Sequence, residues 1–174
     1  TSFRPQNVLL TANSASQGLS DPKVREAVFK TVDRKLIANI VFKGLDYSEP
    51  FPGSLVQFSI QDGYRDNLSK AVTLDVKGAK KLLDEAGWKE GKDGVRVKDG
   101  KKLSIKYTRP TAVPTTKTES ELLQSQLKKI GMEVVMEDVE SAKYFKDYIN
   151  KKNFEITSFT WQGTPYPMMN IGQI

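Results

Sequence analysis

Carboxylates are the main side chains that could act as acid or base in this chain of 174 residues, because it contains no histidine and no cysteine. The lack of these two residue types excludes a serine–histidine or cysteine–histidine nucleophile pair, a zinc site of imidazole and thiolate ligands, and a disulfide. The sequence also lacks the glycine-rich loops that bind phosphates or dinucleotides and the spacing of an EF-hand calcium loop. We therefore expect no enzymatic activity, no metal site and no cofactor.

One group of acidic residues gathers around the end of a predicted strand. It consists of Glu133, Glu137, Asp138 and Glu140. Two of these carboxylates could act as a general acid and base only if they faced each other across a cleft. A solvated acidic edge is the simpler interpretation of the cluster.

A candidate binding segment follows the last predicted strand, which covers residues 154–161. Ligands of α/β sheets bind beyond the carboxyl ends of strands, where an aromatic side chain offers a stiff wall and glycine lets a ligand approach the backbone. The residues predicted to bind a ligand here are Trp161, Gln162, Gly163, Thr164 and Tyr166. A tryptophan buried in the core or at an interface remains the alternative for Trp161.

Arg109 is a second candidate for binding, because it precedes Pro110 at the end of another predicted strand. A guanidinium group can hold a carboxylate through two parallel hydrogen bonds. A solvated arginine is the alternative interpretation.

Three helices are predicted in the first half of the chain from their start and stop signals. Their expected caps are Asp21, Asp33 and Asp75, with Pro22 at the first helical position, and the glycines expected to end the second and third are Gly44 and Gly87. Apolar stripes are predicted at Val24, Ala27, Val28, Thr31 and Val32, at Leu36, Ile37, Ile40 and Val41, and at Ala79, Leu82, Leu83 and Ala86. Residues 47–67 carry prolines and glycines without a sustained period, which predicts a long surface loop.

A β-hairpin is predicted around Asp99–Gly100, a pair that suits the positive φ angles of a type I′ turn. The alternating apolar residues on its two sides are Val95 and Val97, then Leu103, Ile105 and Tyr107. A linker over 108–117 then leads to Thr118-Glu119-Ser120-Glu121, which has the pattern of a capping box.

The helix after this capping box is expected to end at Gly131, and the alternation of Met132, Val134 and Met136 predicts a strand after it. Strand, helix and strand then form a βαβ unit with parallel neighbours. A further helix carrying Tyr144, Phe145, Tyr148 and Ile149 precedes the last strand. We expect an α/β fold with a mixed sheet, this βαβ unit, the β-hairpin and helices packed on the sheet.

The net charge of +6 raises the possibility of a nucleic-acid partner. The basic residues are spread along the chain and many lie beside acids, which is typical of a solvated face. The stacking aromatics of an RNA-binding sheet are also missing. We therefore expect no nucleic-acid partner, although a basic nucleic-acid-binding module remains a less favoured alternative.

Four blocks of the sequence resemble, in family order, the family 5 extracytoplasmic solute-binding proteins of peptide and nickel ABC importers. The blocks are DPKVREAVFKTVDRKLIANIVFKG (21–44), DVKGAKKLLDEAGW (75–88), SELLQSQLKKIGMEVVMEDV (120–139) and FEITSFTWQGTPYP (154–167). The resemblance implies a lobe of the type II periplasmic-binding-protein fold, forming a single domain over 1–174 that is most of the second lobe of a longer protein. Within it, 1–19 would be a lead-in, 20–167 the family-like core, and 168–174 a tail that can fray.

The function that the resemblance implies is binding of an oligopeptide or similar ligand, by hinge closure of two lobes around a cleft. The implied partners are the first lobe of the same protein and a membrane permease, and the implied location is extracytoplasmic, in the periplasm or on a membrane-anchored lipoprotein. Trp161 and Gly163 fall on family positions at the cleft, and some dipeptide-binding members place an arginine near the position of Arg109.

One departure from the family concerns the segment after Trp161. Many peptide-binding members carry an aspartate there that pairs with the ligand's α-amino group, whereas this chain reads QGTPYPMMN. Uncharged or modified ligands, a different anchor from the first lobe, or a scaffolding or regulatory role at the cell envelope without transport would each be consistent with this difference.

Overall fold

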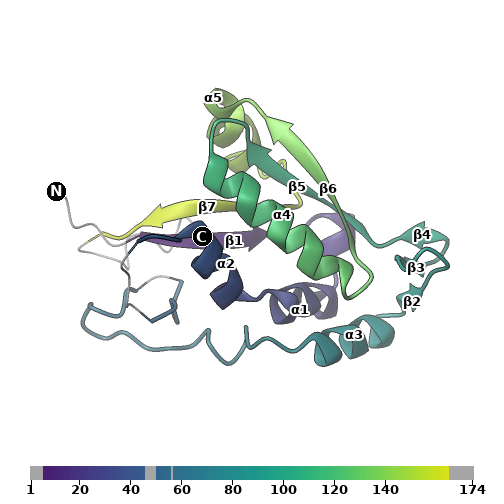
Figure 1. The fold of residues 1–174 in the computed structure, drawn as a ribbon. Coiled ribbons are helices and arrows are strands. Elements are labelled where there is room, and N and C mark those ends of the chain that lie inside the picture. The colour runs from purple at the N-terminus through teal and green to yellow at the C-terminus, as the bar shows by residue number, and fades with distance from the viewer. Residues whose placement is uncertain (1–5, 46–49, 56, 165–174) are drawn as a thin grey trace.

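A four-stranded mixed sheet with the order β1-β7-β5-β6 forms the centre of the molecule (Figure 1). The computed structural model describes residues 6–45, 50–55 and 57–164. The strands of this sheet are β1 (Gln6–Ala12), β5 (Ser104–Pro110), β6 (Glu133–Val139) and β7 (Ile156–Gln162). The helices are η1 (Gln17–Leu19), α1 (Pro22–Thr31), α2 (Arg34–Val41), α3 (Val76–Glu85), α4 (Pro114–Lys128), α5 (Ser141–Lys143) and the π-helical η2 (Tyr144–Ile149).

The predicted βαβ unit is confirmed, because β5 and β6 are parallel and α4 connects them. Their pairing runs from Ser104 opposite Glu133 to Pro110 opposite Val139. On the other side of β5, the parallel partner is β7, which pairs along its whole length with the antiparallel β1. The sheet is therefore mixed, as the sequence predicts.

The helix starts are set by the three aspartates that the sequence singles out. The side chains of Asp21, Asp33 and Asp75 accept hydrogen bonds from backbone N–H groups of the first helical turn at 2.8, 2.9 and 2.8 Å. These bonds satisfy donors that have no partner inside the helix. Gly87, with a φ angle of 88°, directly follows the C-cap of α3 and has the left-handed conformation that ends a helix and favours glycine. Gly44 has the same φ angle but lies two residues after Phe42, the C-cap of α2, so it is not the residue that directly follows the cap as predicted.

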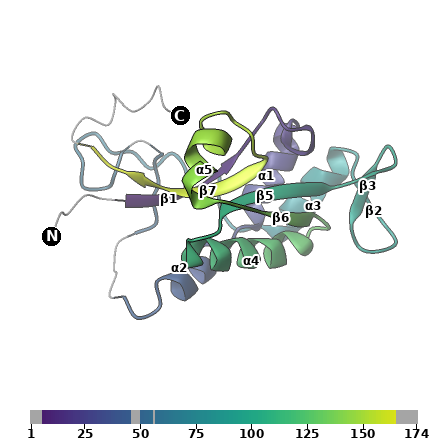
Figure 2. The same ribbon diagram turned by 90° about the horizontal axis from the view of Figure 1, so that it is seen from above.

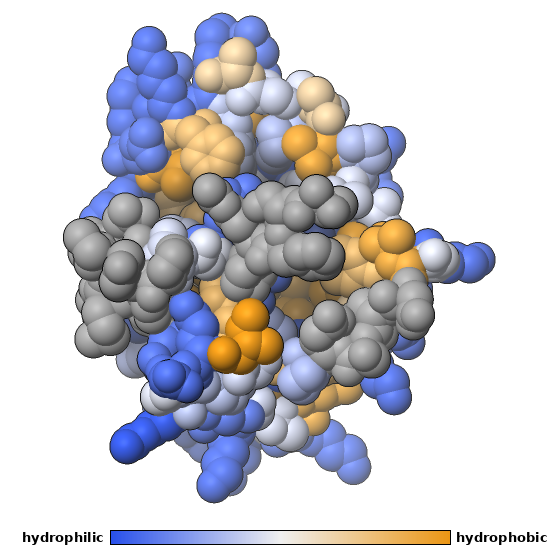
Figure 3. Space-filling view, turned by 90° about the vertical axis from the view of Figure 1, so that its left-hand side faces the viewer, coloured by the Kyte–Doolittle hydropathy of each residue, from blue (hydrophilic) through white to orange (hydrophobic). Residues whose placement is uncertain are grey.

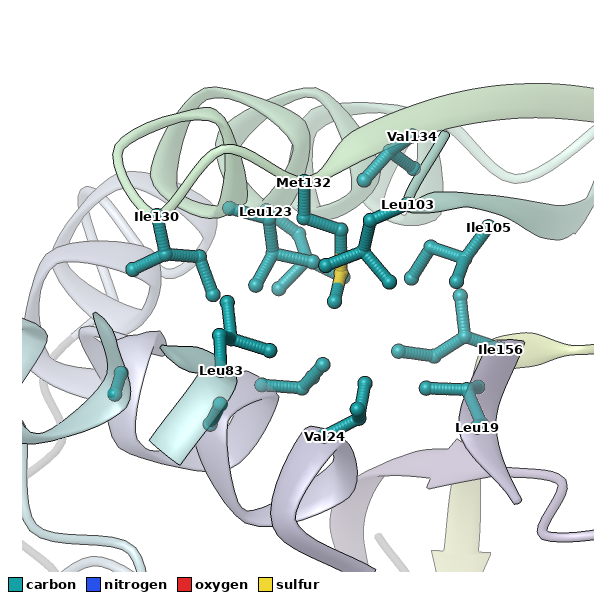
Figure 4. Close-up of a cluster of buried hydrophobic side chains, with 14 of the residues drawn as sticks. Leu19, Val24, Leu83, Leu103, Ile105, Leu123, Ile130, Met132, Val134 and Ile156 are labelled. Carbon is teal, nitrogen blue, oxygen red and sulfur yellow. The ribbon is translucent and has the colours of Figure 1, made fainter. Parts of the chain in front are cut away.

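An apolar core lies between the sheet and the helices α1, α3 and α4 (Figure 4). The predicted stripes of α1 and α3 are buried in it, with Ala27, Val28, Ala79 and Leu83 fully enclosed. From the sheet and from α4 the core receives Leu103, Ile105, Leu123, Leu127, Val134 and Ile156. This packing holds the parallel strands and α4 in fixed relative positions.

The predicted hairpin is correct at its turn but not in its second strand. Asp99 and Gly100 have φ angles of 50° and 74° and connect β3 (Arg96–Lys98) to β4 (Lys101–Lys102), which form a small sheet with β2 (Lys89–Glu90). At Leu103 the chain changes sheets: its N–H donates to Arg96 O at 2.7 Å, and its carbonyl accepts from Glu133 N at 2.9 Å. The fully buried Leu103 separates β4 from β5 at this point.

The predicted capping box is wrong, because α4 begins one turn earlier, at Pro114. Proline has no N–H to satisfy and a φ angle fixed near the helical value, so it suits the first position of a helix. Residues 118–121 consequently lie inside α4, and most of the predicted linker belongs to β5 or to the first turn of α4. Gly131, with φ of 77°, ends the helix as predicted.

Apolar side chains are exposed at the end of the molecule that carries α2 (Figure 3). In the predicted stripe of α2, Leu36 and Ile40 are each 41% exposed, and only Ala38 of this helix is buried. Further exposed apolar residues nearby in the chain are Phe42, Leu45, Phe51 and Leu55. No helix in the described ranges is both long and apolar enough to cross a membrane.

We expect Leu127→Ala to lower the free energy of unfolding by about 2–5 kcal/mol, because Leu127 is fully buried and its removal leaves a cavity under the sheet. Ile60→Ala is a matched control, since Ile60 is 80% exposed, and should change stability by less than roughly 0.5 kcal/mol. Urea unfolding followed by circular dichroism measures both values. Equal effects of the two substitutions would contradict this description of the core.

Candidate functional site

The candidate site lies where β5 and β7 separate. These two strands have a single pair of opposed residues, Tyr107 and Ile156. Beyond Ile156, β7 continues with β1 alone, and the two form a ribbon that extends away from β5 (Figure 1). The edge of β7 that faces β5 therefore has no strand partner for most of its length among the described residues. Separating strand ends of this kind are where ligands bind in α/β sheets.

Side chains take over the hydrogen bonds that the separating strands no longer make with each other. Thr157 Oγ1 donates to Thr108 O at 2.7 Å, and Tyr144 OH donates to Ser158 O at 2.9 Å. Both tyrosine and threonine are buried, and their hydroxyl oxygens lie 2.5 Å apart. These bonds pair main-chain carbonyl groups that would destabilise the fold if they were buried without a hydrogen-bond donor.

A second chain of hydrogen bonds ends at the carboxylate of Glu119 on α4. Tyr107 OH donates to Ser158 Oγ at 2.7 Å, and Ser158 Oγ donates to Glu119 Oε2 at 2.8 Å. Burial raises the pKa of Tyr107, and burial likewise raises the pKa of Glu119, against the opposing effect of the Ser158 hydrogen bond. Because desolvation disfavours the ionised form, the raised pKa of Glu119 marks a carboxylate without a compensating cation.

The two sides of β7 carry different groups. Ser158 faces Glu119 of α4, whereas Phe159 packs edge-on against Phe145 of η2, with ring centres 6.0 Å apart. Side chains alternate along a strand, so Trp161 shares the side of Phe159. Figure 2 shows α4 on one side of β5 and β7 and α5 on the other. The separation is thus bordered by an acidic side and an aromatic side.

Arg109 lies at the end of β5, and its guanidinium group is occupied. Nε and Nη2 donate to the two carboxylate oxygens of Asp138 at 2.6 and 3.4 Å, and Nη1 donates to Ser120 Oγ at 2.8 Å. Arg109 is 8% exposed, and its hydrogen bond holds the pKa of Asp138 below its usual range. The two residues are opposed in the parallel β5–β6 pairing. The guanidinium group of Arg109, which was predicted to bind a ligand carboxylate, thus binds the carboxylate of Asp138 in the same domain.

A shallow hollow of about 220 Å³ lies beside this ion pair. Its lining is Arg109, Pro110, Thr111, Lys117 and Asp138. The polar contacts of Arg109 are with Asp138, Ser120 and Glu121, and none of the contacts found in the described part of the chain joins it to the segment after Trp161. A role for Arg109 in binding remains a prediction.

The other predicted site residues form one continuous segment. Trp161 is half-buried opposite Asn7 of β1, Gln162 is exposed and Gly163 is buried. The carbonyl of Thr164 accepts a hydrogen bond from Gln61 Nε2 at 2.9 Å, so the long loop before α3 reaches this segment. Tyr166 lies outside the described residues, as does the predicted tail 168–174.

The acidic edge that the sequence predicts is neutralised locally. Glu137 accepts from Lys106 at 2.9 Å and from Thr108 at 2.7 Å, and Glu140 pairs with Lys143 at 2.8 Å. Together with the Asp138 pair, these contacts join acids to neighbouring cations rather than to each other. Within the ranges that the structure describes, no group of three or more acidic side chains converges to hold a metal ion.

Sequence reasoning missed Glu119 as a site residue because it assigned this residue to a capping box. With α4 starting at Pro114, the buried positions include Thr116, Ser120, Leu123 and Leu127. Glu119 lies three residues after Thr116 and four before Leu123, which places it at the border of the buried face. A glutamate at the border of the buried face was a signal that the sequence contained. It could be recognised only after α4 was known to start at Pro114.

Comparison with known proteins identifies relatives along nearly the whole chain. Residues 3–173 match the family described as bacterial extracellular solute-binding proteins, family 5 middle. The chain is 34% identical over 157 residues to the oligopeptide-binding protein OppA of Mycobacterium tuberculosis, covering 90% of this chain and 26% of that protein. It is 28% identical over 165 residues to the nickel-binding periplasmic protein of Escherichia coli, covering 92% and 30%.

A solved structure has the same fold. The oligopeptide-binding protein AppA from Bacillus subtilis in complex with a nonapeptide superimposes with a TM-score of 0.73 at 26% identity, covering 92% of this chain and 32% of that one. The type II periplasmic-binding-protein-like fold predicted from the sequence is thereby confirmed. The chain spans about a quarter to a third of the length of the relatives it matches.

We expect Glu119→Gln to stabilise the fold at neutral pH. The pKa of Glu119 is raised above 4.5 in the folded state, so the native state binds more protons than the unfolded state, and the free energy of unfolding falls as pH rises through this window. Glutamine removes the charge and keeps an acceptor for Ser158. The gain at pH 7 should exceed the roughly 0.5 kcal/mol typical of surface substitutions and should disappear below pH 4.

Urea unfolding at the two pH values measures this difference. Glu121→Gln is the matched control, because Glu121 is on the same helix with its side chain 54% exposed, and its effect should stay within roughly 0.5 kcal/mol. A stabilisation by Glu119→Gln that is the same at both pH values would contradict the burial of an ionised carboxylate.

Proposed function

The chain belongs to family 5 of the bacterial extracellular solute-binding proteins, and we propose that it forms most of the second lobe of a two-lobed protein that binds oligopeptides. The lobe would act by closing with its partner lobe around the ligand, without making or breaking bonds. The closed protein would then present the ligand to a membrane permease of an ABC importer. Its location would be extracytoplasmic, in the periplasm or on a lipid-anchored protein.

The observation that carries this proposal is the edge of β7 next to Trp161 and Gly163, which has no strand partner on its β5 side beyond Ile156 in the described part of the chain. An extended peptide can add to a free strand edge through main-chain hydrogen bonds, while side-chain pockets read alternate residues. Gly163 has no side chain and would let such a ligand approach the backbone, and the half-buried Trp161 would supply an aromatic wall. The relative from Bacillus subtilis binds a nonapeptide on the same fold.

The side-chain chemistry of the chain favours a peptide over a metal ion coordinated directly by imidazole or thiolate side chains of this lobe. One relative is a nickel-binding protein, but this chain has no histidine or cysteine to supply imidazole or thiolate ligands. The hydrogen-bonding groups and the aromatic wall along β7 suit an extended peptide.

The exposed apolar side chains of α2 and the following loop support the two-lobed arrangement. Leu36, Ile40 and Leu45 are 41%, 41% and 67% exposed, and apolar side chains show on the face of the molecule drawn in Figure 3. Apolar patches of this kind mark surfaces that pack against another body. The first lobe of the same protein would cover them.

A role as an envelope scaffold on the same fold is the second candidate. It is favoured by one observation, namely that no aspartate or glutamate occurs from Gln162 to Ile174 to pair with a peptide's α-amino group in that segment. Such a protein would bind no peptide, and the following experiment separates the two functions.

In the full-length protein, we expect oligopeptides to raise the melting temperature, because a ligand that binds only the native state stabilises it by mass action. Trp161→Ala should weaken binding about tenfold, equivalent to roughly 1.4 kcal/mol. Trp88→Phe is the matched control, since Trp88 packs against the core behind α3, and it should leave peptide affinity unchanged.

Thermal-shift titration with a diverse peptide library measures these effects. The absence of any shift in the wild-type protein would contradict peptide binding and favour the scaffold. Equal loss of affinity in both tryptophan variants would show that Trp161 acts through the fold rather than by contact.

A further inference from the structure

We propose that Glu119 binds the ammonium group of the ligand at the separation of β5 and β7. The inference rests on the proposed function and adds a specificity: the preferred ligand has a free amino group, such as the amino terminus of a peptide. It assigns this recognition to α4 rather than to the segment that follows Trp161.

The position of Glu119 is the first support. Its hydrogen-bond partner Ser158 is the second residue of β7 beyond the single β5–β7 pair, so the carboxylate lies at the start of the separation. Trp161 is three residues further along the same strand, or about 10 Å at 3.3 Å per residue. A ligand lying along the free edge of β7 would span that distance with about three residues.

The lack of a cationic partner is the second support. The three acids around the end of β6 that approach a cation are neutralised, Glu137 by Lys106, Asp138 by Arg109 and Glu140 by Lys143. Glu119 forms no ion pair with any lysine or arginine in the described ranges, although it is more enclosed than Asp138 or Glu140. A partly buried carboxylate without a cation is less stable in its ionised form than one that is paired.

The direction of the hydrogen-bond chain is the third support. Tyr107 OH donates to Ser158 Oγ, so the hydroxyl proton of Ser158 is directed to Glu119 Oε2. Glu119 thereby accepts a hydrogen bond that favours its ionised form, against the burial that raises its pKa. Only Oε2 is engaged in this chain of bonds, and an ammonium with three N–H donors can bind the other oxygen.

The titratable groups near Glu119 lie on the elements packed against it. Tyr107 of β5 and Tyr144 of η2 are both buried and have raised pKa values, so they are neutral donors at physiological pH. Arg109 of β5 is committed to Asp138, and its contact with the Glu119 helix is through Ser120. None of these groups supplies the positive charge that Glu119 lacks.

The test uses the full-length protein and one peptide sequence without lysine, arginine or histidine, in two forms: with a free amino terminus and with an acetylated one. Isothermal titration calorimetry at pH 7 gives the affinity of each form. We expect the wild-type protein to prefer the free amine by about tenfold or more, as for other charge-assisted contacts. Glu119→Gln should abolish that preference by weakening binding of the free form alone.

Two further variants make the result specific. Glu26→Gln, which removes a carboxylate from the solvent side of α1, should keep the full preference. Glu119→Asp retains the charge on a shorter side chain and should keep part of it. Unchanged binding of the acetylated peptide to Glu119→Gln shows that the site is still folded.

The outcomes separate this inference from the function on which it rests. A wild-type protein that binds both peptide forms equally, or a preference that survives in Glu119→Gln, overturns the role of Glu119 and leaves peptide binding intact. Loss of both peptide forms in Glu119→Gln shows a structural role and also overturns it. Failure of the wild-type protein to bind either form overturns the proposed function and this inference together.

Discussion

The single pairing between β5 and β7 is the constraint on which the rest of the site depends. β7 runs parallel to β5 and pairs with it at Ile156 only. Along its whole length β7 pairs with β1, and beyond Ile156 these two strands form a two-stranded ribbon. Beyond Ile156, the main-chain groups on the β5 side of β7 then have no neighbouring strand among the described residues. Since buried polar groups must be paired, side chains from β5, η2 and α4 take the place of that strand. The polar cluster of Thr157, Ser158 and Tyr144 is the consequence.

The features predicted correctly from the sequence are those determined by a few consecutive residues. An aspartate that accepts bonds from the next turn, or a glycine with positive φ after a helix, needs no distant partner, so Asp21, Asp75 and Gly131 were interpreted correctly. The parallel β5–α4–β6 unit was predictable because its period and order are local as well. The start of α4 was missed because two signals competed, and Pro114 outweighed the capping-box pattern.

The contacts that the sequence could not reveal join residues far apart in the chain. The pairing of β1 with β7 connects Gln6 to Gln162, and no local pattern specifies it. Arg109 and Asp138 are opposed across parallel strands, which becomes visible only when the β5–β6 register is known. The strand-end rule concerns the end of one strand, and Trp161 and Gln162 do end β7, whereas their role in binding stays a prediction. It could not say whether Arg109 would be free.

Arg109 and Glu119 differ in how the fold surrounds their charges: Arg109 is paired with Asp138, whereas Glu119 forms no ion pair among the described residues. Arg109 meets Asp138 and Ser120, so its desolvation is offset inside the domain and the ion pair fixes the ends of β5 and β6. Glu119 receives only a neutral donor, and its burial works against the ionised form. Such a group lowers stability in the absence of a ligand, and proteins retain costs of this kind where binding or catalysis needs them. In the proposed site, the hydrogen bonds from Tyr107 to Ser158 and from Ser158 to Glu119 would hold the carboxylate in place before a cation binds.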